Sequence, residues 1–182
     1  EKGRIAAEQS SRNWGWVRRM GRDPRELPLI REAMRLWHGM AAQVGRDLGF
    51  RRSGILYLCE SGEDVAVQRD WLDRAGEHAL DTRIVRGDEL AALLEERPAA
   101  GHAARHTASD GRAEPQKAAP AIAAAAQAAG VRIVEHCAVR AIRTAGGRVP
   151  GVVTERGEVA CTSVVVSAGF WSWRLRGLGL RL

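Results

Sequence analysis

The sequence predicts an α/β protein that carries an antiparallel β-meander as an arm. Three observations in the second half of the chain predict this class. An alanine-rich segment with helical character, 115–129, precedes a short apolar segment at 131–137. Two turn signals then separate strand-like segments after residue 138, and a continuous apolar run follows at 162–168. A run without polar alternation is typical of a strand that is buried on both faces.

The first half of the chain predicts a long loop followed by alternating helices and strands. Residues 1–22 have no apolar period, and the length of this loop indicates a functional segment. From Asp23, apolar residues recur every three or four positions and predict a helix that ends at Gly49. A strand is predicted at 54–60, and a second helix after it, opened by a capping box of Ser61 and Asp64. A short strand at 83–86, a brief helix at 88–96 and an unperiodic loop at 97–112 follow.

The second half is marked by clearer signals. Pro115 suits the first turn of a helix, and Gly130 suits its end. Strands are predicted at 131–137, 139–144 and 149–154, with tight turns at Gly146-Gly147 and Arg156-Gly157. We expect 131–137 and 162–168 to be neighbours in one sheet, with the meander between them packed as a separate arm.

The charge of the chain does not indicate a nucleic-acid partner. Its 182 residues carry a formal net charge of +6, but the arginines are scattered among 22 acidic residues and only Lys2 and Lys117 are lysines. An Arg-rich module that binds anionic partners is therefore the weakest alternative. No apolar run reaches the ~18 residues that a membrane span needs.

The cysteines and histidines indicate a reduced, metal-free protein. The three cysteines lie far apart without a CxxC pair, which predicts free thiols and a cytoplasmic location. They are Cys59, Cys137 and Cys161. His102 and His106 are spaced i, i+4, but they lie in a predicted loop, and we expect no metal site there.

One motif is specific enough to indicate a family. Residues 164–172 read VVVSAGFWS, an apolar strand that leads to a small residue and a glycine. This string resembles the strand-then-glycine motif of the D-amino-acid oxidase-like flavoproteins, which include glycine, sarcosine and D-amino-acid oxidases and dehydrogenases. The resemblance implies that Ala168, Gly169 and Trp171 lie against FAD, because only glycine lets a main chain approach a dinucleotide so closely. Trp171 is either a lid over the cofactor or a core residue.

Two further segments resemble the same family. The segment SDGRAEPQKAAPAI at 109–122 resembles the family's return to the nucleotide domain, and the resemblance implies that the main chain of Val139 contacts the adenine end. The first residues, EKGRIAAEQSSRNWGWVR, resemble the segment after the second strand of a Rossmann unit, where an acidic residue receives the ribose hydroxyls. The residues that this resemblance assigns to the cofactor are Glu1, Lys2, Ser10, Ser11, Arg12, Asn13 and Gly15. Trp14 and Trp16 either pack in the interior or border the isoalloxazine. Trp37 and Trp71 are predicted core residues, and Asp110 and Arg112 are predicted to fix the loop before the helix.

The resemblance implies a partial FAD-binding Rossmann-like domain of the glutathione-reductase type with part of an α+β substrate domain. Residues 1–22 and 110–182 are assigned to the first and 23–109 to the second. The implied activity is oxidation of a small amine or amino acid by hydride transfer to FAD, without a named catalytic residue. The alternative is a non-catalytic remnant that is unable to hold FAD.

The sequence also departs from the family pattern. It contains no GxGxxG, which we expect before Glu1, and 94–107 lacks the family's usual strand-forming character. We expect the 182 residues by themselves to be colourless, poorly soluble and inactive.

Overall fold

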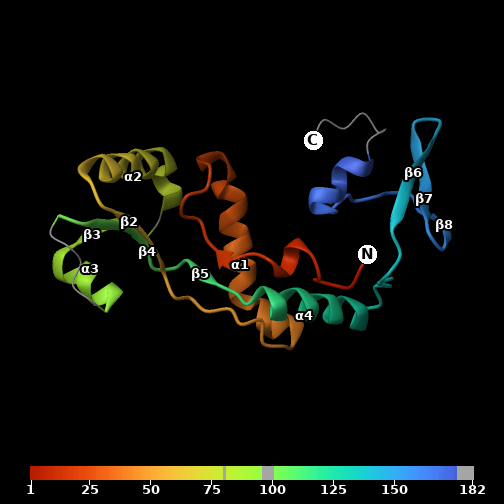
Figure 1. The fold of residues 1–182 in the computed structure, drawn as a ribbon, viewed down its shortest axis with the longest axis horizontal. Coiled ribbons are helices and arrows are strands. Elements are labelled where there is room, and N and C mark those ends of the chain that lie inside the picture. The colour runs from red at the N-terminus through yellow and green to blue at the C-terminus, as the bar shows by residue number, and fades with distance from the viewer. Residues whose placement is uncertain (80, 96–100, 176–182) are drawn as a thin grey trace. The chain divides into compact units, whose positions relative to one another are not determined.

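The computed structural model describes residues 1–79, 81–95 and 101–175 (Figure 1). The chain divides into two compact units: a central unit, Asn13–Ala121, and a terminal unit made of Glu1–Arg12 and Ile122–Leu182. Three antiparallel sheets are present in the described residues, with orders β1-β5, β2-β4-β3 and β6-β7-β8. Together with the helices they confirm the predicted α/β class.

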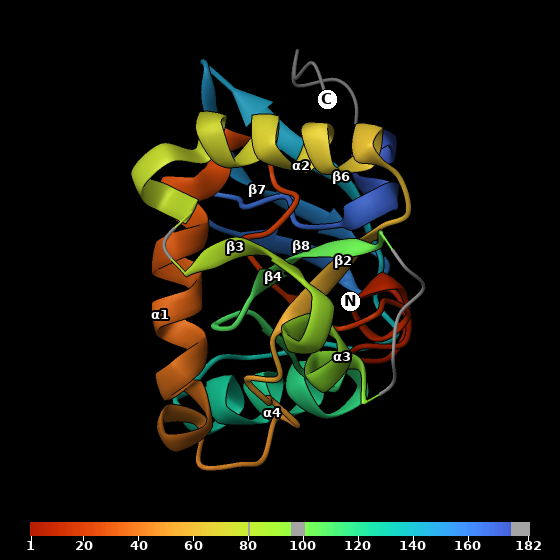
Figure 2. The ribbon, with the colours of Figure 1, turned by 90° about the vertical axis from the view of Figure 1, so that its left-hand side faces the viewer.

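The main sheet of the central unit has a helix on each face. Its strands are β2 (Ile55–Cys59), β4 (Ala103–Thr107) and β3 (Thr82–Arg86), and its helices are α2 (Gly62–Ala75) and α3 (Gly87–Leu94). Val65 of α2 packs against Cys59 and Ala103 on one face. Leu90 of α3 packs against Val85 and Ala104 on the other. Figures 1 and 2 show the strands between these two helices.

The central strand β4 corrects the predicted loop at 97–112. All five residues of Ala103–Thr107 are buried, and the strand pairs with β2 on one side and β3 on the other. Alanine, arginine and histidine are poor strand formers, but a central strand is stabilised by two ladders and by packing on both faces. Its two alanines leave room for α2 and α3. The predicted helix end at Glu96 and residues 97–100 lie outside the described residues.

Helix α1 (Leu27–Val44) forms the second part of the central unit. The Asp23 side chain accepts from Arg25 N and caps a 3-10 turn, η2 (Pro24–Glu26), which leads into α1. The helix ends at Gly45, with φ 69°, and not at the predicted Gly49. Leu48 follows the helix as a buried residue of the core that Met34 also joins. The regular spacing of apolar residues continues beyond the end of α1, because the helix and the segment after it both contribute residues to this core.

A small core joins α1 to the start of α4 (Pro115–Ala128), which runs across the boundary between the units. Its buried members are Val17, Met34, Leu48, Ala113, Ala118 and Ala121, with Trp37 packed against them. The short strands β1 (Trp16–Val17) and β5 (Gly111–Arg112) pair beside it. Gly130, with φ 92°, follows α4 as predicted. Trp71 is buried with Leu27 and Ala75, so Trp37 and Trp71 are confirmed as core residues.

Local signals correctly predicted the start of α2. The Ser61 side chain accepts from Asp64 N, and Asp64 in turn accepts from Ser61 N, which is a complete capping box. A short 3-10 helix, η3 (Gly76–Ala79), follows α2. Among the described residues, no helix combines the length and apolar character that crossing a membrane requires.

The terminal unit contains the meander as a sheet of its own. Its strands are β6 (Val139–Ala145), β7 (Arg148–Thr154) and β8 (Gly157–Ala160). Gly146 and Gly147 both have positive φ and make the turn between β6 and β7. No other strand of the described residues joins this sheet, so the predicted antiparallel meander is confirmed, while its packing as an arm beside a second sheet stays a prediction.

The predicted strands at 131–137 and 162–168 are not formed. Residues 134–137 exchange main-chain hydrogen bonds with Glu1 and Gly3, but His136 has φ 49° and interrupts the extended course. Residues 162–168 join no ladder in the described chain, and Val165 is 87% exposed. A strand needs a continuous ladder of main-chain hydrogen bonds along its edges. Within the described residues, 131–137 has only the interrupted contacts with Glu1 and Gly3, and 162–168 joins no sheet. The two segments are therefore not shown to be neighbours in one sheet.

Candidate functional site

The first residues of the terminal unit run beside residues 134–137. The main-chain N of Glu1 donates to Val134 O at 2.9 Å, and His136 N donates to Gly3 O at 2.9 Å. The Glu1 carboxylate accepts from Gly3 N at 3.0 Å, and Ile5 N donates to Glu135 at 2.6 Å. These contacts fix the main chain that carries Glu1 and Lys2.

A cluster of charged and aromatic side chains surrounds Trp171. The Lys2 ammonium lies 4.3 Å from the centroid of the Trp171 ring, and the Arg174 guanidinium lies 5.1 Å from it. Lys2 also forms a 2.8 Å ion pair with Glu8, and this hydrogen bond and charge lower the pKa of Glu8. Trp171 belongs to a 3-10 segment, η4 (Gly169–Leu175). The structure thus brings together Lys2 and Trp171, two of the predicted cofactor residues.

Gln9 connects the same two segments a second time. It begins the 3-10 turn η1 (Gln9–Ser11), and its Oε1 accepts from Phe170 N at 2.9 Å. Gly169 has φ 52°, and a β-carbon placed on it would overlap Oε1 of Gln9. The positive φ favours glycine at this turn, and a larger residue would also push aside the end of the Gln9 side chain.

The remaining predicted residues of the terminal unit lie on its surface or close to it. Ser10, Arg12 and Ala168 are exposed, and Ser11 is half-buried and donates to Glu8 O at 3.3 Å. Val139 begins β6, where it pairs with Thr154. Ser10 and Ser11 lie on η1, directly after Gln9, and Ala168 precedes the Gly169 turn.

Asn13 and Gly15 belong to the central unit. Asn13 Oδ1 accepts from Gly15 N at 2.8 Å, and Gly15 O accepts from Ala113 N at 2.8 Å. Gly15 is buried, with φ 71°, and a β-carbon on it would overlap the Ala113 carbonyl. Trp14 is 80% exposed and Trp16 is 41% exposed, so neither side chain is buried in this unit.

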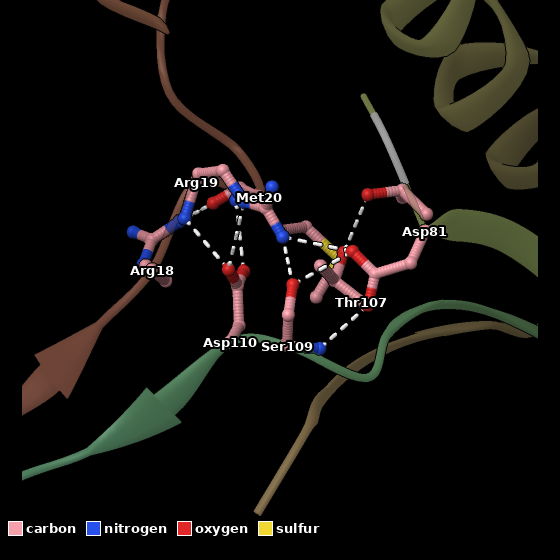
Figure 3. A network of polar contacts seen from close by, with 8 residues as sticks. Arg18, Arg19, Met20, Asp81, Thr107, Ser109 and Asp110 are labelled. Carbon is pink, nitrogen blue, oxygen red and sulfur yellow. Dashed lines mark hydrogen bonds and ion pairs between the residues drawn. The ribbon is translucent and has the colours of Figure 1, made fainter. Parts of the chain in front are cut away.

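A buried polar network supports the loop that follows Asn13 (Figure 3). Asp110 is fully buried, and its two oxygens accept from Arg19 N and Met20 N, each at 3.0 Å. Nε of Arg19 lies 3.5 Å from the same carboxylate. Gly54 N donates to Asp110 O at 2.9 Å. Asp110 thus fixes the loop before α4 to the 19–20 segment, as the sequence predicted for it.

Asp81 extends this network to the edge of the sheet. Arg19 Nη2 lies 2.8 Å from Asp81, and Ser109 donates to Asp81 through both its main-chain N, at 2.6 Å, and its hydroxyl, at 2.7 Å. Burial alone would raise the pKa of Asp81, but the hydrogen bonds from Ser109 and the charge of Arg19 outweigh it and lower that pKa. Arg19 is therefore held between two carboxylates.

Within the part of the chain that the structure describes, Arg105 of β4 is the other buried arginine, and no carboxylate pairs with it. It is 2% exposed, its guanidinium lies 4.1 Å from the Trp71 ring centroid and 5.1 Å from that of Tyr57, and its Nε has no hydrogen-bond partner in the described chain. Burial lowers the pKa of Arg105 to about 10. Within residues 1–79, 81–95 and 101–175, no group of three His, Cys, Asp or Glu side chains is arranged to hold a metal ion.

Gln9 and the Arg19 network were not found from the sequence. Gln9 directly precedes Ser10, but its contact is with Phe170, 161 residues away. Arg19 lies 91 residues from Asp110. The sequence did single out Asp110, which is the only acidic residue in the segment 97–112.

The architecture and the sequence together define the class of this protein. The family model described as FAD dependent oxidoreductase matches residues 1–182. The chain therefore belongs to this family of FAD-dependent oxidoreductases, and membership implies a flavin cofactor.

Individual relatives carry several names. The solved L-amino acid deaminase from Proteus myxofaciens, in complex with anthranilate, has a TM-score of 0.88 and 34% identity over 94% of this chain and 40% of its own. Sarcosine oxidase subunit beta of Rhizobium meliloti (strain 1021) is 28% identical over all of this chain and 45% of its own length. The mitochondrial pyruvate dehydrogenase phosphatase regulatory subunit of Mus musculus is 25% identical over 96% of this chain and 20% of its length. The chain spans less than half the length of each of these relatives.

Proposed function

We propose that the protein containing this chain oxidises the C–N bond of a small amine or amino acid, with FAD as the hydride acceptor. The substrate class we propose is a D-amino acid, glycine or a sarcosine-like amine. One observation supports the proposal most directly: Lys2 and Gln9 contact the Gly169–Trp171 turn. These contacts bring together the first segment of the chain and the 164–172 segment, both of which resemble cofactor-binding segments of the family.

The residues present suit a flavin dinucleotide. The hydroxyls of Ser10 and Ser11 and the exposed cation of Arg12 suit a diphosphate, which requires hydrogen-bond donors and positive charge. The Glu1 carboxylate is an acceptor for ribose hydroxyls. We propose the same cofactor role for Lys2, Asn13, Gly15, Val139, Ala168, Gly169 and Trp171.

The chemistry that we propose needs little from the side chains of this chain. Bound flavin supplies the hydride acceptor, while the protein binds, orients and excludes water. We propose that Trp171 acts as an aromatic wall of the site, and the cations of Lys2 and Arg174, 4.3 Å and 5.1 Å from its ring centroid, support this by restricting the ring. We assign no residue of this chain as a general base.

The proposed organisation follows from these roles. Residues 1–22 and 110–182 are the FAD-binding part, and 23–109, with the β2-β4-β3 sheet, is the substrate or cap part. Cys59, Cys137 and Cys161 are free thiols, which favours a reducing compartment and the cytoplasm.

Purification of the full-length protein tests the proposal. We expect a yellow protein whose visible absorbance bleaches when a D-amino acid, glycine or sarcosine is added without oxygen. The 182 residues alone, expressed in parallel, are expected to be colourless. A full-length protein without flavin absorbance after reconstitution with FAD would contradict the proposal.

A second candidate is a non-catalytic role. The similarity to a phosphatase regulatory subunit favours it, since that relative is named for regulation. The same purification separates the two candidates. A protein that retains flavin, but is bleached by no amine or amino acid in a broad panel, supports the non-catalytic role.

A further inference from the structure

The space beside Gly169 is occupied by the protein itself. A β-carbon on Gly169 would overlap Oε1 of Gln9, and the next nearest atom, Cδ of Gln9, would lie 3.3 Å away. A glycine in this motif is readily explained by the approach of a cofactor. In this chain the carboxamide of Gln9 fills the place of the missing side chain.

The same oxygen atom holds the turn that follows. Oε1 of Gln9 accepts from Phe170 N at 2.9 Å, and Trp171 N donates to Ala168 O at 3.0 Å, which closes the turn. A larger residue at 169 would therefore displace the Gln9 carboxamide and remove the acceptor of Phe170 N. A side chain at 169 would therefore have two consequences: strain of the left-handed backbone, and loss of the Gln9 hydrogen bond to Phe170 N.

A second contact connects the same two segments. Lys2 lies over the Trp171 ring and forms an ion pair with Glu8, the residue before Gln9. The turn at 169–171 is thus held at its main chain by Gln9 and at its aromatic side chain by Lys2. Ser10 and Ser11 continue from Gln9 on η1.

We infer that Gln9 is a positioning residue of the flavin site, which fixes the Gly169–Trp171 turn relative to η1 by occupying the space of the absent β-carbon. The inference rests on the proposed flavin-binding function and does not require Gln9 to contact the cofactor. Gln9 acts through Phe170 N, and the cofactor is positioned by the two segments that Gln9 joins.

A double-mutant cycle in the full-length protein tests this coupling. The variants are Gln9→Ser, Gly169→Ala and the double variant, with Gln127→Ser at an exposed position of α4 as the matched control. The measurement is the FAD dissociation constant from flavin fluorescence quenching, together with the melting temperature of each apoprotein.

The coupling predicts a specific pattern. Gln9→Ser should weaken FAD binding about fivefold to tenfold, which is the effect of losing one neutral hydrogen bond. Gly169→Ala should weaken it further, because it displaces the carboxamide and strains the backbone at positive φ. The double variant should bind no more weakly than Gly169→Ala alone, since the hydrogen bond is already lost there. Gln127→Ser should bind as the parent does.

A second readout separates positioning from a loss of stability. At saturating FAD, Gln9→Ser should blur the fine structure of the visible flavin bands, while its apoprotein melts within about 2 °C of the parent. Fold-changes that multiply in the double variant, or a Gln9→Ser spectrum identical to that of the parent, would overturn the inference. A parent protein that binds no FAD would instead overturn the proposed function, and the inference with it.

Discussion

The two carboxylate oxygens of Asp110 accept hydrogen bonds from the main-chain N–H groups of Arg19 and Met20, 91 and 90 residues earlier in the chain. The Arg19 side chain then turns back toward the same carboxylate and toward Asp81. A fully buried acid therefore determines the path of the segment between Gly15 and Gly21. The first prediction concerns this contact.

Replacing Asp110 with alanine should lower the free energy of unfolding by about 3 to 5 kcal/mol, because it leaves two buried main-chain donors without their acceptor and removes one of the two carboxylates that hold Arg19. Asp110→Asn keeps one acceptor and should cost less. Urea unfolding of the full-length protein measures both. Asp73→Ala, at an exposed position of α2, is the control and should change stability by less than about 0.5 kcal/mol. Equal effects at positions 73 and 110 would contradict the assigned role.

Asp81 should make stability depend on acid pH. Its pKa is lower in the folded state than its ordinary value, because Ser109 and Arg19 stabilise the carboxylate. A carboxyl group of this kind stabilises the fold above its unfolded pKa, about 4, and loses that contribution as the pH falls through its folded pKa. The difference in stability between the parent and Asp81→Asn should therefore be present at pH 6 and shrink below pH 4. Denaturation as a function of pH, with Asp73→Asn to control for the lost charge, checks this.

Two glycines with the same backbone conformation should respond differently to alanine. Gly15 and Gly45 have φ of 71° and 69°, but only Gly15 faces a close neighbour, the carbonyl of Ala113, while Gly45 has open space around it. Gly45→Ala should cost about 1 to 2 kcal/mol, the strain of a left-handed residue. Gly15→Ala should cost at least about 3 kcal/mol, because main-chain atoms must move as well. Similar costs at the two sites would show that the approach of Ala113 is not a constraint.

Arg105 should be replaceable with a gain in stability. Burial lowers its pKa to about 10, so the charged form is disfavoured in the folded state and its charge costs stability at neutral pH. Arg105→Met keeps the volume and removes the charge, and should raise the free energy of unfolding by about 1 to 2 kcal/mol. Arg105→Lys retains a positive charge but loses the stacking on Trp71, so it should lower the free energy of unfolding. A destabilised methionine variant would show that the contacts with Trp71 and Tyr57 outweigh the cost of burial.

Elements with local signals could be predicted from the sequence. The capping box of Ser61 and Asp64, the helix between Pro115 and Gly130, and the turn at Gly146-Gly147 all depend on residues within a few positions of one another. Strand β4 could not be predicted, since its residues favour no strand and its conformation is set by β2 and β3. The strand predicted at 162–168 is wrong for the opposite reason. Its composition favours a strand, but within the described chain no other strand pairs with it.

The candidate site divides in the same way. Lys2, Gly169 and Trp171 were predicted from their resemblance to family motifs, and the structure brings them into one cluster. Gln9 was not predicted, because its side chain occupies the space beside Gly169, a residue 160 positions away in the sequence. A local sequence pattern does not reveal such a long-range contact. Their assignment to the cofactor stays a prediction that the flavin titrations test.

The order of strands in the β2-β4-β3 sheet also determines when this part of the chain is able to fold during synthesis. β2 and β3 pair with β4 and not with each other, although β4 is translated after both of them. Until residue 107 has left the ribosome, the nascent chain displays two unpaired strands, one of which reads Ile-Leu-Tyr-Leu-Cys. Exposed strands of this kind are where a nascent protein aggregates or engages a chaperone. The yield of soluble protein should therefore depend on how rapidly residues 60–107 are translated, and codon choice in that interval is a practical means of improving it.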